Sequence, residues 1–196
     1  MISNVCKIEK GVKDLSLILK ESERVSIYAN LDEKQTLQLR LICEELDGML
    51  PNIVDDFNGE FWIDYEDGVC KVNAKIDIEN LNVEEKEELI KISTSKKNSA
   101  AKGIVGKIRD AIDNLLLNEN AKMALASSGG YCLHAGYFGA SAGTPFWSLS
   151  NYKSNATEEN NEDWDELEKS IITKLADDVL VGVKGKSAHI IIVKKF

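Results

Sequence analysis

Two alternating segments joined by Asp67-Gly68 constrain the fold of this chain more than any other feature. The first reads Phe-Trp-Ile-Asp-Tyr-Glu (61–66) and the second reads Val-Cys-Lys-Val-Asn-Ala (69–74). Asp-Gly favours a two-residue type I′ turn, and such a turn fixes the register in which the strands pair. On one face this register pairs Tyr65 with Cys70, Ile63 with Val72 and Phe61 with Ala74; on the other it pairs Asp64 with Lys71 and Trp62 with Asn73. Turn chemistry and side-chain alternation therefore predict the same β-hairpin, with one apolar face.

A long amphipathic helix is predicted directly before this hairpin. Asn30 and Asp32 are both favourable N-cap residues, and Pro51 is expected to end the helix. The apolar positions between them are three and four residues apart, which places them on one helix face: Leu39, Ile42, Cys43, Leu46, Met49 and Leu50. The acidic residues Glu44, Glu45 and Asp47 lie beside this stripe, where a solvated surface is their simplest role.

The remaining patterns predict an alternation of helices and strands. In chain order we expect a short helix at 12–21, a strand at 24–29, the long helix, the hairpin, a helix at 82–92, a helix carrying Ile104, Ile108, Ala111, Ile112 and Leu115, a strand at 144–149, a helix at 164–175, and a closing hairpin at 179–193. The closing strands are apolar on both faces, which is typical of central strands. The economical packing of this order is an α+β fold, a two-layer sandwich of a mixed β-sheet with helices packed on one face.

The stretch from Met123 to Tyr152 contains no Asp, Glu, Lys or Arg. A membrane-spanning helix should be dominated by large apolar residues, whereas this stretch is rich in Gly, Ser and Ala and is interrupted by Pro145. We therefore interpret it as an uncharged, glycine-rich loop inserted into one domain that covers residues 1–196, and we expect no membrane partner.

Composition limits the partners and the compartment. The formal net charge is −9, and the sequence pI is about 4.9. Nucleic-acid binding needs clustered positive charge, so we expect no nucleic-acid partner. The four cysteines, Cys6, Cys43, Cys70 and Cys132, are far apart and lack a C-x-x-C pair, which favours buried reduced thiols. The chain shows no signal-peptide pattern, and we expect a cytoplasmic protein.

The end of the chain carries a likeness to a known superfamily. Residues 168–195 read Glu-Lys-Ser-Ile-Ile-Thr-Lys-Leu-Ala-Asp-Asp-Val-Leu-Val-Gly-Val-Lys-Gly-Lys-Ser-Ala-His-Ile-Ile-Ile-Val-Lys-Lys. This segment contains, in order, a helix, an Asp-x-Val-like strand start, a glycine turn and a last strand ending in Lys. Together with the long helix Arg40–Leu50, this order resembles the ATP-binding fold shared by histidine kinases, Hsp90, DNA gyrase, MutL and the anti-sigma-factor serine kinases.

The resemblance implies a nucleotide site, but the chain departs from the family's motifs. In the family the long helix presents a carboxylate that activates water or a hydroxyl, and an Asn four residues later holds magnesium. Here the resemblance implies Glu45 as the catalytic carboxylate, with Met49 at the metal position; the same step from Glu44 reaches Gly48. Neither Met49 nor Gly48 offers a side-chain oxygen, so the resemblance provides no metal ligand at this position.

Two further motifs bear on the nucleotide. The family's Asp-x-Gly-x-Gly corresponds to Asp77-Ile-Glu-Asn-Leu81, which keeps the adenine-contacting Asp and lacks both glycines. The family also has a glycine-rich motif near its lid, and the residues here that resemble it are Lys97, Gly103, Gly106 and Lys107. A helix start with lysines could bind phosphate there. An ordinary strand end and an ordinary helix containing glycines explain the same residues.

Three hypotheses follow from these residues. We favour a degenerate ATPase-fold regulatory protein that binds a protein partner and does not hydrolyse ATP, which makes the chain no enzyme and requires no cofactor. The second is an active, divergent ATPase or protein serine kinase that uses ATP and magnesium. The third is a small-molecule or peptide binding module that uses the loop at 123–152, where Tyr131, Tyr137, Phe138, Phe146 and Trp147 lie. The sequence predicts no oligomeric state.

Overall fold

The structure is a computed structural model that describes residues 1–11, 15–54, 56–77, 103–117, 131–133, 145–155, 167 and 169–196. The described strands are β1 (Cys6–Glu9), β2 (Asn58–Glu66), β3 (Val69–Asp77), β4 (Tyr131–Leu133), β5 (Pro145–Ser148), β6 (Asp178–Lys184) and β7 (Ser187–Lys195). The described helices are α1 (Leu15–Tyr28), α2 (Glu33–Ile53), α4 (Gly103–Leu117), α6 (Leu149–Asn155) and α8 (Ile171–Leu175).

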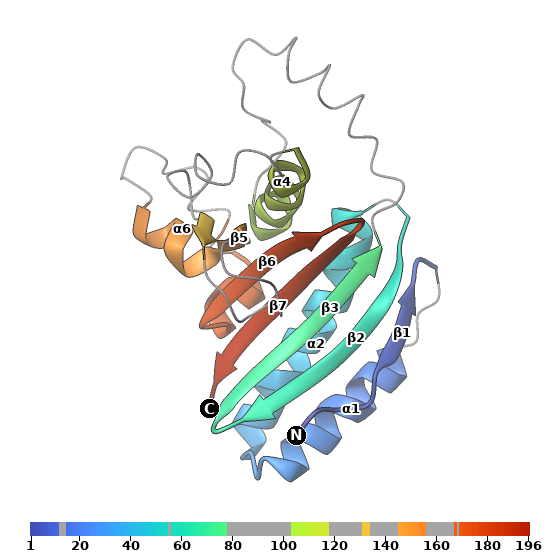
Figure 1. The fold of residues 1–196 in the computed structure, drawn as a ribbon. Helices are drawn as coiled ribbons and strands as arrows, with labels where there is room; N and C mark the ends of the chain where they lie inside the picture. Colours follow the sequence, from blue (N-terminus) through green and yellow to red (C-terminus); the bar gives the residue numbers. More distant parts are fainter. Residues whose placement is uncertain are drawn as a thin grey trace.

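The seven described strands form one sheet in the order β1-β2-β3-β7-β6-β5-β4, and α1 and α2 run behind it in the view of Figure 1. Buried side chains of the sheet, α1, α2 and α4 form one hydrophobic core, which confirms the α+β fold with helices on one face. The sheet is not mixed, because every described strand pair is antiparallel. Five of these six pairs join strands that are consecutive among the described strands, and the sixth is β3–β7. Consecutive strands joined by a tight turn, such as β2–β3 and β6–β7, pair in this direction.

The predicted hairpin forms β2 and β3 in the predicted register. Trp62 lies opposite Asn73, and Ile63 lies opposite Val72. The turn residues Asp67 and Gly68 have φ angles of 48° and 80°, as a type I′ turn requires. On the predicted apolar face, Phe61, Ile63, Cys70, Val72 and Ala74 are buried. The register therefore directs this face toward the helices.

The long helix is confirmed, although it extends further than predicted. Asp32 accepts a hydrogen bond from Gln35 N (2.8 Å), and the Gln35 side chain accepts one from Asp32 N (3.0 Å), which completes a capping box. Pro51 does not end the helix; it lies in the last turn, and α2 continues to Ile53. Proline removes only one intrahelical donor there, while Val54 N still closes the helix on Leu50 O (3.1 Å).

The strand predicted at 24–29 is wrong, because α1 runs from Leu15 to Tyr28. Ile18 and Val25 are buried one above the other on this helix, and two buried serines return their hydroxyls to its own carbonyls. Ser22 Oγ donates to Leu19 O (2.8 Å), and Ser26 Oγ donates to Ser22 O (2.9 Å). The strand that precedes the two helices in the chain is β1, at Cys6–Glu9, and it pairs with β2.

The second half of the chain follows the predictions in part. All five predicted apolar residues of α4 are buried, and β6 and β7 form the closing hairpin, with β7 central between β3 and β6. The helix predicted at 164–175 is interrupted, because Ser170 has an extended backbone (φ −71°, ψ 136°) and caps a separate helix, α8. Strand β4 and helix α6 were not predicted.

Several predicted features lie outside the described residues: the helix at 82–92, Lys97, Tyr137 and Phe138. None of the described helices combines the length and the apolar character needed to cross a bilayer.

Candidate functional site

The predicted catalytic carboxylate lies on α2 without fixed partners. Glu45 is half-buried and forms no hydrogen bond or ion pair within the described part of the chain, whereas its neighbour Glu44 accepts from Arg40 Nε at 2.9 Å. Four residues after Glu45, the Met49 side chain is 5% exposed and belongs to the hydrophobic core. Gly48, four residues after Glu44, is exposed and has nothing within 4 Å of the position a Cβ would take. The position where the resemblance expects a metal ligand is therefore filled by core packing.

The predicted adenine contact lies at the end of the sheet. Asp77 is the last residue of β3, is exposed, and accepts a hydrogen bond from Ser187 Oγ at 3.1 Å. Ser187 begins β7 and is paired with Asp77 in the sheet register. The carboxylate is thus held where β3 ends and β7 begins.

The predicted phosphate-binding residues belong to α4, except for Lys97. Gly103 starts this helix with φ 65°, a conformation that favours glycine, and Gly106 is buried within the first turn. Lys107 places its Nζ 5.1 Å from the centroid of the Tyr152 ring on α6, a cation–π arrangement. Lys107 is therefore engaged with α6 in this structure.

The candidate nucleotide residues lie on elements that are near one another, but they do not form a closed site. Helix α4 packs against α2, and both α4 and the end of β3 lie toward the upper end of the molecule in Figure 1. Asp77 bonds to Ser187 and not to Glu45, and no group of three or more His, Cys, Asp or Glu side chains among the described residues could hold a metal ion.

A polar network that the sequence did not predict lies on the outer face of the sheet, opposite α2. The Asp64 carboxylate accepts from Trp62 Nε1 (3.1 Å) and from Asn73 Nδ2 (3.0 Å). Asn73 is 2% exposed, and its Oδ1 lies 3.1 Å from His189 Nε2. The imidazole also packs on Trp62, with 5.2 Å between the ring centroids. The network thus joins β2, β3 and β7 through side chains alone.

The surroundings of His189 disfavour its charged form. Burial, and to a smaller extent the neighbouring Lys75 ammonium, together lower the pKa of His189 to about 4. Asn73 Nδ2 is a donor to Asp64, so Asn73 Oδ1 is an acceptor and the neutral imidazole donates through Nε2. His189 is therefore a neutral, packed histidine near pH 7.

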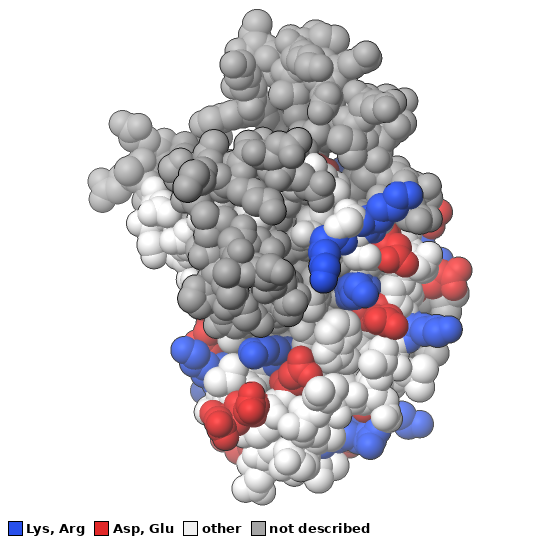
Figure 2. Space-filling view, in the orientation of Figure 1, with Lys and Arg blue, Asp and Glu red and all other residues white. Residues whose placement is uncertain are grey.

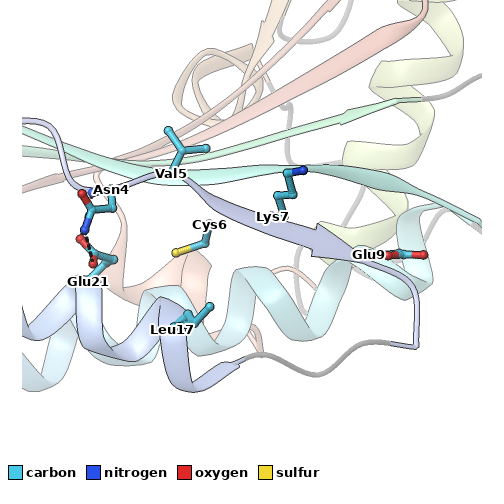
Figure 3. A pocket seen from close by; sticks show the side chains of 7 residues that line it. All are labelled: Asn4, Val5, Cys6, Lys7, Glu9, Leu17 and Glu21. Carbon is cyan, nitrogen blue, oxygen red and sulfur yellow. Dashed lines mark hydrogen bonds between the residues drawn. The ribbon is translucent and has the colours of Figure 1, made fainter.

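A hollow of about 420 Å³ lies between β1 and α1 (Figure 3). At one end Glu21 closes it, accepting from Asn4 N (2.9 Å), from Asn4 Nδ2 (3.0 Å) and from Arg24. Burial would raise the pKa of Glu21, but the hydrogen bonds from Asn4 and Arg24 lower it below its ordinary value. Cys6 and Leu17 lie between this end and Glu9. None of the predicted site residues lines this hollow.

The start of β6 is a second polar centre that the sequence did not predict. Asp178 accepts from Ser150 N (2.9 Å), from Ser150 Oγ (2.7 Å) and from the buried Ser148 Oγ (2.9 Å). These bonds join β6 to the start of α6, so Asp178 acts as a structural cap.

The cysteines and aromatic residues agree with packing roles. Cys6, Cys43 and Cys70 are buried and form no disulfide, and burial raises the pKa of Cys70 to about 12, so the Cys70 thiol is a poor nucleophile. Three of the five aromatic residues named for the binding-module hypothesis are also buried: Tyr131, Phe146 and Trp147. These three do not form an exposed docking surface.

Comparison of the chain with protein-family models, with curated proteins and with solved structures gives no match. The assignment of a function therefore depends on the residues of this chain and their geometry.

Proposed function

We propose that this chain is a regulatory protein related to the histidine kinase, Hsp90, gyrase and MutL ATPases, and that it binds another protein without hydrolysing ATP. One observation carries the proposal: Met49 is buried in the core at the α2 position where the family's metal-binding Asn would stand. A thioether is a poor ligand for magnesium, which prefers hard oxygen donors. Phosphoryl transfer depends on the metal for charge neutralisation, so the loss of this ligand argues against hydrolysis.

Hydrolysis and nucleotide binding can be tested directly on the full chain. We expect no magnesium-dependent release of phosphate from ATP at millimolar nucleotide, and no difference between the native chain and Glu45→Gln. Magnesium-dependent hydrolysis that Glu45→Gln abolishes and Glu44→Gln retains would instead establish the active ATPase hypothesis. Isothermal titration with and without magnesium would separate binding from turnover.

Exposed apolar side chains support the protein-binding part of the proposal. Ile27 is 75% exposed and Tyr28 is 63% exposed at the end of α1, and Leu37 is 55% exposed near the start of α2. All three residues lie near the short connection between α1 and α2, and exposed apolar patches are typical of protein contact sites.

The corner defined by Ile27, Tyr28 and Leu37 can be tested by affinity capture from the source cells. A protein retained by the native chain should be lost with Ile27→Asp or Leu37→Asp. Ile171→Asp is the matched control, because Ile171 is also an exposed apolar residue (39%) but lies on α8. Equal retention by all four proteins would contradict this docking site.

A further inference from the structure

Strand β1 is one edge of the sheet, and its outer peptide groups have no partner within the described part of the chain. It pairs with β2 on one side, in a register that sets Lys7 opposite Glu60 and Ile8 opposite Gly59. Lys10 N donates to Phe57 O at 3.1 Å in the same register. Alternate residues of an antiparallel strand direct their N–H and C=O groups to the same side, so Cys6 and Ile8 bond to β2. The peptide groups of Lys7 and Glu9 therefore point away from the sheet.

The side chains of β1 also alternate. Cys6 and Ile8 are buried on the helix side, whereas Lys7 and Glu9 are exposed on the outer face. On that outer face the register produces a row of alternating charge across the sheet: Lys75 of β3 lies opposite Glu60 of β2, which lies opposite Lys7 of β1. Figure 2 shows acidic and basic side chains interspersed over this face. The row ends at the edge on a positive charge.

We propose that a second copy of this chain docks on β1 by antiparallel β1–β1 pairing, with Lys7 of each copy opposite Glu9 of the other. In this register the outward peptide groups of Lys7 and Glu9 form the hydrogen bonds between the two copies. The two Ile8 residues lie opposite each other on the two-fold axis that relates the copies. It also extends the row of alternating charge, because Glu9 of the second copy follows Lys7. The two sheets become one continuous sheet.

Charge selects this register among those that pair the outward peptide groups. A shift of one residue in each copy sets Lys7 opposite Lys7, and a shift in the other direction sets Glu9 opposite Glu9. Like charges directly opposite each other are destabilising, whereas opposite charges stabilise a cross-strand pair. Exposed Lys and Glu also discourage pairing with unrelated edge strands, so the same residues favour a copy of this chain over other partners.

The surroundings of β1 fit a second copy. Val5 is 55% exposed and Leu17 is 43% exposed, and both line the hollow between β1 and α1 (Figure 3). Lys7 and Glu9 line the same hollow, so a second β1 paired at this edge lies along it. Apolar side chains that are exposed in one copy then gain neighbours from the other.

The test is the oligomeric state of the full chain, measured by sedimentation equilibrium over a range of concentrations. Lys7→Glu or Glu9→Lys alone places like charges at both cross-strand positions, and each should weaken the dimer by about tenfold or more. Both side chains are exposed, so circular dichroism should show an unchanged fold. The double variant Lys7→Glu/Glu9→Lys restores both pairs and should dimerise as the native chain does.

A mixture of the two single variants provides the sharpest control. One copy then carries two acidic side chains and the other carries two basic ones, so a mixed dimer has opposite charges at both positions. We expect the mixture to dimerise although neither variant does so alone. A native chain that stays monomeric, or a dimer that both single substitutions leave intact, would overturn the proposal.

Discussion

Acidification should destabilise the folded chain through His189. Burial and the Lys75 ammonium hold the pKa of His189 at about 4, whereas an unfolded histidine titrates near 6.5. Because the folded-state pKa is the lower one, the stabilisation is complete above pH 6.5. It is lost as pH falls from 6.5 through about 4, since the unfolded chain then binds a proton that the folded chain excludes.

The structure sets the size of this effect. The difference between the two pKa values corresponds to about 3 kcal/mol in the free energy of unfolding, of which about 2.5 kcal/mol should be lost by pH 4.5. Protonation would also disturb the imidazole packing on Trp62, whose ring centroid lies 5.2 Å away. The network through Asn73 would lose no donor, because Nε2 carries a proton in both states.

The assay compares the native chain with His189→Gln, whose amide can still donate to Asn73 Oδ1. Urea unfolding at several pH values between 7.5 and 4.5 gives the free energy of unfolding of each protein. The free energy of unfolding of the native chain should fall by about 2.5 kcal/mol more than that of His189→Gln over this range. The carboxylates common to both proteins contribute equally and cancel in this comparison. A difference that stays constant with pH, or an NMR titration that puts the His189 pKa near 6.5, would refute this reasoning.

Four further substitutions test local stability. Gly48→Ala should stabilise α2 by up to about 1 kcal/mol, because Gly48 is an exposed helix residue with open space at its Cβ position. Gly59→Ala should destabilise the fold, because its Cβ would collide with the backbone oxygen of Lys75 in β3. Chemical denaturation that ranked the two variants in the opposite order would contradict both expectations. Asp32→Ala should cost about 1 kcal/mol by removing the cap, with Asp32→Asn as a control that retains an acceptor. Asp178→Ala should lower hydrogen-exchange protection in α6 more than in α1, because it removes the side-chain bonds that hold the start of α6; equal losses would show that Asp178 is not a local cap.

The elements that the sequence predicts well are those specified by neighbouring residues. The β2–β3 register follows from Asp67-Gly68 and from alternation on both sides of it, and the start of α2 follows from Asp32. The segment 24–29 resembles a strand because Val25 and Ile27 alternate with polar residues, a pattern that a helix also produces over so few residues. The structure contains the helix, in which Val25 is buried against the core and Ile27 is exposed.

The polar centres could not be predicted because their members are distant in the sequence. His189 and Asn73 are 116 positions apart, and only the pairing of β3 with β7 brings them together. Asp178 and Ser148 are 30 positions apart, and their contact depends on where α6 starts. The prediction of Glu45, Asp77 and Gly103 depends on the order of motifs along the chain, which predicts the order of elements and does not predict side-chain positions.

The central position of β7 has a consequence for how the chain must fold. Residues 1–77 form β1, α1, α2, β2 and β3, yet the outer edge of β3 is completed only by the last strand, whose Ser187 contacts Asp77 across 110 positions. During synthesis the ribosome releases this edge long before its partner exists. A nascent or truncated chain therefore presents an open β3 template, and its solubility depends on how soon β7 arrives.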